Sequence, residues 1–84
     1  MKKTFFVDVR SRQEFDSGTV ADAINIPLDQ VEGNIDAFKG HDTIVVFCRS
    51  GARAEFAKDI LNAEGITNVI NGGSWQEVAR RLDK

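Results

Sequence analysis

Two short and nearly continuous apolar runs restrict this chain to a narrow set of folds. They span Thr4–Val9, which is rich in Phe and Val, and Thr43–Phe47, which reads Thr-Ile-Val-Val-Phe. Strands that are apolar on both faces are typical of a parallel sheet covered on both sides. Shorter apolar pieces at Ala23–Ile26 and Asn68–Asn71 predict two further strands.

Helix starts are marked at three places between these strands. Ser11, Asp29 and Ser74 each precede a glutamate by three positions, which is the spacing of a capping box or of its Asp variant. Each box follows a candidate strand within a few residues. Strands that alternate with helices in this way predict right-handed crossovers and a parallel sheet.

The longest predicted helix spans Ala52–Glu64. It ends before Gly65, a residue that readily adopts the left-handed conformation found after many helices. Its apolar residues recur at helical spacing and are expected to form one face. These residues are Phe56, Ala57, Ile60 and Leu61.

The elements together predict a small three-layer α/β domain, in which a small parallel sheet carries helices on both faces. A chain of 84 residues has room for a single domain, which is expected to span residues 1–84. The formal net charge of −2 is spread along the chain, so no basic face for nucleic acid is expected. One cysteine cannot form an internal disulfide, and the paired Cys and His spacing of a zinc site is missing from the sequence. No metal or other cofactor is therefore expected.

Cys48 lies where the second apolar run ends and the long helix is about to begin. In open parallel sheets, ligands gather at this edge because free backbone amides and the positive end of a helix favour anions. Arg49 and Arg53 add positive charges nearby. Gly51 permits a tight backbone turn, and Ser50 offers a hydroxyl donor. The sequence therefore predicts a loop that binds an anion and favours the thiolate form of the cysteine.

A lone cysteine at the end of an apolar strand can also be an unreactive core residue. Two arginines, a glycine and a following helix are hard to explain around an inert thiol, and they favour a reactive one. Arg53 falls in the first helical turn, where a cation opposes the helix dipole, and this placement indicates an anionic partner. Cys48 is thus the candidate nucleophile. The candidate substrate-binding residues are Arg49, Ser50, Gly51, Ala52 and Arg53.

Four ordered segments resemble motifs of the rhodanese family. Val46–Ala54, which reads Val-Phe-Cys-Arg-Ser-Gly-Ala-Arg-Ala, resembles its active-site loop. Phe6–Phe15 resembles its Asp-Val-Arg strand and Glu-Phe helix, and Gly18–Leu28 resembles its Ala-Ile-Asn-Ile-Pro stretch. Gly65–Gly73 resembles its closing pattern. The resemblance covers nearly the whole chain, and the length is similar to that of the short phage-shock type of rhodanese.

The resemblance implies a sulfurtransferase that works through a persulfide on Cys48. The thiolate would take a sulfane sulfur from thiosulfate or a similar donor and pass it to cyanide or a thiol acceptor. Backbone amides from Arg49 to Arg53 would stabilise the charge on the sulfur. The two arginines would select an anionic donor.

Two other activities stay open. One is a persulfide carrier module loaded by a protein partner, since so short a chain has no extended substrate pocket. The other is a small Cys-dependent phosphatase or arsenate reductase. Those relatives carry a loop one residue longer, whereas four residues separate Cys48 from Arg53 here. The shorter loop should hold a sulfur atom better than a phosphoryl group.

Four other residues invite a functional interpretation but have a structural one. Asp8 and Arg10 could form an acid/base pair, yet the resemblance favours a structural ion pair. His41 is interpreted as an ordinary loop histidine and Trp75 as a packing residue.

The expected partners are a small anionic sulfur donor and a thiol or cyanide acceptor, with no nucleic acid and no membrane. The chain is expected to be a monomer or a weak homodimer. Rhodanese domains generally have a helix and a strand before the Asp-Val-Arg strand, so the resemblance implies an N-terminally trimmed domain. Asp8 cuts short the apolar run that a signal peptide needs. A cytoplasmic location is predicted, or a periplasmic one if a native signal peptide has been removed.

Overall fold

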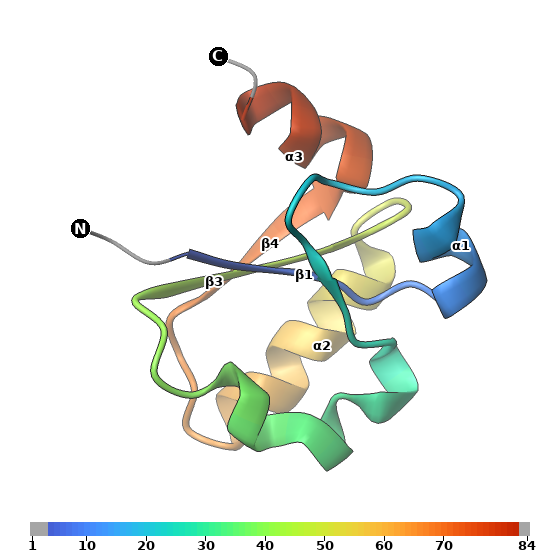
Figure 1. Cartoon of the computed structure of the whole chain (residues 1–84). Helices are drawn as coiled ribbons and strands as arrows, with labels where there is room; N and C mark the ends of the chain where they lie inside the picture. The colour runs from blue at the N-terminus through green and yellow to red at the C-terminus, as the bar shows by residue number, and fades with distance from the viewer. Residues whose placement is uncertain (1–3, 83–84) are drawn as a thin grey trace.

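The computed structural model describes residues 4–82 and arranges them around one four-stranded sheet (Figure 1). The 3-10 helices are labelled η. In chain order the elements are β1 (Thr4–Asp8), α1 (Arg12–Asp16), β2 (Ile24–Asn25), η1 (Leu28–Gln30), η2 (Glu32–Phe38), β3 (Thr43–Cys48), α2 (Ala52–Ala63), β4 (Val69–Ser74) and α3 (Trp75–Leu82). No helix within this part of the chain is both long and apolar enough to cross a membrane.

All pairings in the sheet are parallel, and the strand order is β2-β1-β3-β4. The central pair runs from Thr4 opposite Thr43 to Asp8 opposite Phe47. The carboxyl ends of β1 and β3 therefore meet at one edge of the sheet. The loops that follow these strands, together with α1, lie at that edge (Figure 1).

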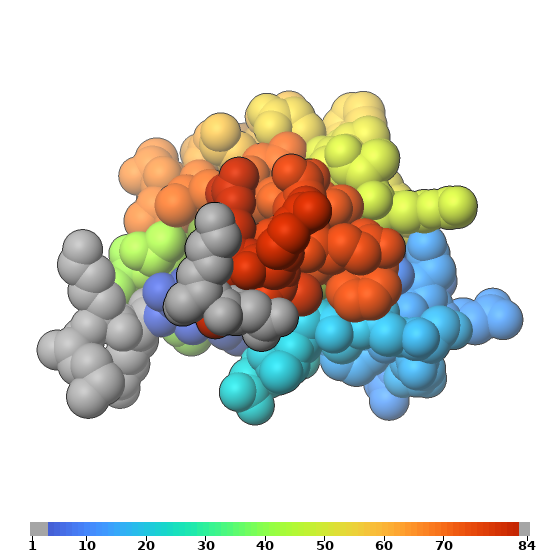
Figure 2. All heavy atoms as spheres, turned by 90° about the horizontal axis from the view of Figure 1, so that it is seen from above, coloured from blue at the N-terminus to red at the C-terminus, as the bar shows by residue number. Residues whose placement is uncertain are grey.

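The two faces of the sheet carry different helices, as predicted for a three-layer domain. Side chains alternate along β3, so that Ile44, Val46 and Cys48 face α2 while Val45 and Phe47 face α3. The α2 face holds the larger core. On the other face, α3 lies over the sheet (Figure 2). In the same view the blue residues near α1 and the yellow-green residues near position 50 lie side by side at one edge. The predicted fold class is confirmed.

Most of the predicted elements are present with small shifts in their ends. Ser11 caps α1 through a complete capping box, and Ser74 and Glu77 form the same reciprocal contacts before α3. The helix predicted at Ala52–Glu64 spans Ala52–Ala63, and Gly65 follows it with a φ of +84°. These signals were reliable because each depends on residues close together in sequence.

Two local predictions were wrong. Asp29 does not cap a helix, because Pro27, two residues earlier, takes the capping position of the 3-10 helix η1: the N–H of Gln30 donates to the carbonyl of Pro27. Phe56 is 63% exposed, although it was expected on the buried face of α2. The buried face is formed by Ala54, Ala57 and Leu61. Phe56 is two residues from Ala54, which places it on nearly the opposite side of the helix.

Candidate active site

Cys48 is the last residue of β3, at the carboxyl edge of the sheet, and it is only 1% exposed. The backbone N–H of Gly51 donates to its Sγ atom over 2.9 Å. The thiol therefore lies at the base of the loop that connects β3 to α2, with a polar donor directed at the sulfur.

Gly51 occupies a position that a larger residue could not share. Its φ is +97°, in the left-handed region that favours glycine. A Cβ atom at this position would lie 3.3 Å from the Cα of Gly73, so the turn also passes close to the end of β4. The loop thus needs glycine both for its backbone conformation and for this close approach.

The environment of Cys48 lowers the pKa of its thiol below the ordinary value. Burial acts in the opposite direction and raises the pKa, but hydrogen bonds from backbone amides outweigh it. In order of decreasing effect, these amides belong to Ala54, Ser50, Gly51 and Arg53. Two of them lie in the first turn of α2, where helical N–H groups lack partners within the helix. The site therefore stabilises a negatively charged sulfur with backbone dipoles.

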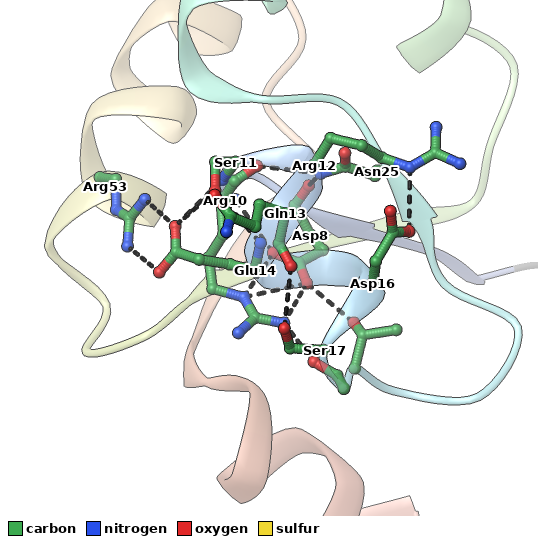
Figure 3. Close-up of polar contacts among 12 residues, drawn as sticks. Asp8, Arg10, Ser11, Arg12, Gln13, Glu14, Asp16, Ser17, Asn25 and Arg53 are labelled. Atoms are coloured by element: carbon green, nitrogen blue, oxygen red, sulfur yellow. Dashed lines mark hydrogen bonds and ion pairs between the residues drawn. The ribbon is translucent and has the colours of Figure 1, made fainter.

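Arg53 has a carboxylate partner within the chain. Its Nη1 and Nη2 atoms donate to the two carboxylate oxygens of Glu14 over 2.7 and 3.0 Å (Figure 3). This pairing, together with hydrogen bonds from Ser11, lowers the pKa of Glu14 to about 2. Glu14 in turn raises the pKa of Arg53. The ion pair fastens α1 to the first turn of α2.

The other predicted residues lie on the same loop but face different surroundings. Arg49 is exposed and lines a cavity of about 320 Å³. That cavity is also lined by Arg10, Gln13, Glu14, Ser17, Trp75 and Gln76. Ser50 is exposed and lines a separate cavity of about 450 Å³. Ala52 is the exposed first residue of α2.

Asp8 and Arg10 form the buried ion pair expected of them (Figure 3). The carboxylate of Asp8 accepts hydrogen bonds from the backbone and the guanidinium of Arg10, and from the hydroxyl of Thr19. Arg10 also donates to the carbonyl of Gly18 and lies over the ring of Trp75, with 5.4 Å between its Cζ atom and the ring centroid. The pair is held by contacts within the chain, and Trp75 packs against the cluster of Val20, Phe47 and Val78, as predicted.

Comparison with known proteins identifies the family. The model of the rhodanese-like domain matches residues 1–80. This chain belongs to the rhodanese-like family. Among relatives, the thiosulfate sulfurtransferase PspE of Escherichia coli (strain K12) is 36% identical over 76 residues, which cover 88% of this chain and 73% of PspE. A protein of Allochromatium vinosum named sulfurtransferase is 31% identical over 65 residues, covering 77% of this chain and 61% of that protein.

Solved structures agree with the assignment to the rhodanese-like family. A structure described as a rhodanese with anions from E. coli superposes with a TM-score of 0.82 at 35% identity, covering 90% of this chain and 92% of that one. The human single-domain sulfurtransferase TSTD1 superposes with a TM-score of 0.77 at 29% identity, covering 94% of this chain and 83% of that one. The likeness extends through most of each domain.

Three contributors to the site of this rhodanese-like chain were missed in the sequence. The amide of Ala54 lies one residue beyond the predicted set, although the start of α2 could have indicated it. Glu14 was noticed as part of a capping box and of a family motif but not as a partner of Arg53, and that contact spans 39 positions. Asn71, which donates to the carbonyl of Gly51, gave no signal in the sequence.

Proposed function

We propose that this chain is a thiosulfate sulfurtransferase that carries the transferred sulfur as a persulfide on Cys48. The supporting observation is a lone cysteine whose thiol is surrounded by backbone amides and has a lowered pKa. A thiolate is the nucleophile that sulfur transfer requires, and the same amides would stabilise the charged persulfide. The name of PspE as a thiosulfate sulfurtransferase supports the same activity.

The proposed reaction has two displacement steps. The Cys48 thiolate attacks the outer sulfur of thiosulfate, the S–S bond of the donor breaks, and sulfite leaves with the electron pair. Cyanide or a thiolate then attacks the outer sulfur of the persulfide. The bond between the two sulfurs breaks, the Cys48 thiolate is regenerated, and thiocyanate or a new persulfide is released.

Roles follow for the other loop residues. The amides of Ser50, Gly51, Arg53 and Ala54 would hold the charged sulfur, because they are the amides that favour the thiolate. Arg49 would bind the anionic end of the donor, since it is exposed and has no carboxylate partner in an ion pair of the described residues. Arg53, paired with Glu14, would contribute its positive charge without leaving that partner.

The direct test is to incubate the protein with thiosulfate and measure its intact mass. The wild type should gain one sulfur atom, and the Cys48→Ser variant should gain none. Addition of cyanide should return the wild type to its original mass and produce thiocyanate. A wild-type mass that stays unchanged with thiosulfate and several other sulfane donors would refute the proposal.

A persulfide carrier loaded by a protein partner is the second candidate. It is supported by the burial of the Cys48 thiol, which is 1% exposed and does not line the cavity that contains Arg49. Loading only from a protein donor, with little thiosulfate:cyanide turnover, would favour this carrier. Strong turnover with the small molecules would exclude it in favour of the enzyme.

The phosphatase or arsenate reductase alternative has a simple test as well. Hydrolysis of an aryl phosphate that is lost in Cys48→Ser would support it, and no hydrolysis across several phosphoesters would remove it. The cytoplasmic location and the monomeric or weakly dimeric state stay predictions.

A further inference from the structure

The side chain of Asn71 connects β4 to the Cys48 loop. Its Nδ2 atom donates to the carbonyl oxygen of Gly51 over 3.0 Å and to Oε1 of Glu55 over 3.0 Å. Its Oδ1 atom accepts the N–H of Gly73 over 2.9 Å. One amide group offers two donor hydrogens and an acceptor, so this single side chain satisfies partners in three segments.

Asn71 lies where the regular pairing of β3 with β4 ends. Val46 is opposite Asn71, but Cys48 is opposite Ser74. A step of two residues on β3 therefore faces a step of three on β4, which is a bulge. Gly73 within this bulge has a φ of +84°, and the Asn71 side chain accepts its N–H. The side chain of Asn71 therefore contacts both the bulge and the Cys48 loop.

Gly51 needs to be held from outside because glycine has access to many backbone conformations. Its N–H donates to the Cys48 sulfur, and its carbonyl accepts from both the N–H of Glu55 and the side chain of Asn71. We propose that Asn71 is a positioning residue that fixes Gly51 so that its N–H points at the sulfur of Cys48. This inference rests on the proposed role of Cys48 as the sulfur-carrying nucleophile.

Asn68, near the other end of β4, provides a matched control. Its Nδ2 atom donates to the carbonyls of His41 and Asp42 over 2.7 and 3.1 Å. Like Asn71, it joins β4 to a neighbouring loop through its amide. It belongs to the opposite edge of the sheet from the thiol, because it precedes β4 while Cys48 ends β3. Loss of either side-chain amide removes comparable hydrogen bonds, but only the amide of Asn71 reaches the Cys48 loop.

The experiment measures the Cys48 pKa from the pH dependence of alkylation by iodoacetamide. The chain has one cysteine, so the rate reports this thiol alone. Asn71→Ala should raise the pKa by about one unit, because one amide of the set loses its alignment; alkylation at low pH should then be about tenfold slower. Asn68→Ala should leave the pKa unchanged. The substitution at position 71 removes no charged residue, although Glu55 loses its hydrogen bond from Asn71. The charged residues near the loop are Asp8, Arg10, Glu14, Arg49, Arg53, Glu55, Glu77 and Arg81.

A second variant protects the test against a folding defect. Asn71→Asp keeps an acceptor for the N–H of Gly73 but cannot donate to Gly51. Its added charge also raises the thiol pKa, so the measurement is repeated in about 1 M salt, which screens that charge. The pKa should stay raised there, because the lost donor is not restored by salt.

Either of two results overturns the proposal. In the first, both Asn71 variants keep a Cys48 pKa within about 0.2 unit of the wild type in high salt. In the second, Asn68→Ala raises the pKa as much as Asn71→Ala, which would mean that general loosening is the cause. No sulfur donor is used in these measurements. A wild type that accepts no sulfur therefore refutes the proposed function, while the pKa comparison still decides the role of Asn71.

Discussion

Two arginine–carboxylate pairs, Asp8 with Arg10 and Glu14 with Arg53, lie near the Cys48 loop (Figure 3). They differ most in burial. The side chains of Asp8 and Arg10 are 0% and 6% exposed, whereas those of Glu14 and Arg53 are 31% and 38% exposed. The buried pair joins residues two positions apart at the end of β1. The half-exposed pair joins residues 39 positions apart, on α1 and α2. Similar chemistry thus serves a local turn in one case and a connection between elements in the other.

The difference in burial sets what each pair contributes. A buried pair gains little over a well-packed apolar alternative, but removal of one partner leaves an uncompensated charge in the interior. A pair open to water is screened, and its loss costs little. The first pair is therefore expected to be critical for folding, and the second to adjust how firmly the active-site loop is held.

The largest effect should come from Asp8→Ala. The substitution leaves the buried guanidinium of Arg10 without its carboxylate, and it removes the acceptor for the Thr19 hydroxyl. We expect the free energy of unfolding to fall by about 3 to 5 kcal/mol, measured by urea denaturation. For a domain of this size that loss is a large part of the total stability.

The control for this prediction replaces both partners. A variant with Asp8→Leu and Arg10→Met removes the buried charge along with its partner, so it should be more stable than Asp8→Ala. If Asp8→Ala changes the free energy of unfolding by less than about 1 kcal/mol, the buried pair is not the critical one, and the comparison fails.

Glu14→Gln should have a smaller effect that depends on pH. The pKa of Glu14 is lowered from its ordinary value of 4.5 to about 2, first of all by Arg53. Because the folded protein favours the charged carboxylate, the pair stabilises the fold above about pH 4.5, and this stability is lost as the pH falls towards 2. Both side chains are about one third open to water, so we expect only about 1 kcal/mol at neutral pH.

Thermal unfolding of the wild type and of Glu14→Gln across this pH range tests the sign. The difference in Tm should be greatest at neutral pH and should shrink steadily as the pH falls from about 4.5 towards 2, since the wild-type carboxyl becomes about half protonated near pH 2. A difference that grows as the pH falls would contradict the assignment of the Arg53 pair as the cause of the lowered pKa.

The sequence predicted those parts of the molecule that depend on neighbouring residues. The apolar run Thr43–Phe47, the capping box at Ser11 and the glycine-containing turn after Cys48 each carry their information within a few positions, and together they indicated a parallel α/β domain and its loop. Arg53 is an instructive case. Its unfavourable place in the first turn of α2 indicated an anionic partner, and the structure pairs it with Glu14 of the same chain. The role of Arg53 in substrate binding stays a prediction.

The connections that hold the loop could not be predicted in this way. The contact of Glu14 with Arg53 spans 39 positions and that of Asn71 with Gly51 spans 20. Both depend on the strand order β2-β1-β3-β4, which brings the ends of separate strands to one edge. A pattern of residue types along the chain does not determine which of several side chains at that edge will meet.

The smallest effect is expected for a third arginine–carboxylate pair, Arg12 with Asp16 on α1. Its Nε to Oδ1 distance is 3.0 Å, against 2.7 Å for the shortest contact of each of the other two pairs, and its side chains are 75% and 59% exposed. Water screens the pair, so Arg12→Ala should change the free energy of unfolding by no more than about 0.5 kcal/mol, measured by urea denaturation. The buried pair and the Arg53 pair share the same shortest distance of 2.7 Å, so distance does not separate those two, whereas burial ranks all three. A loss for Arg12→Ala as large as that for Glu14→Gln would show instead that α1, with only five residues, depends on every contact that it makes.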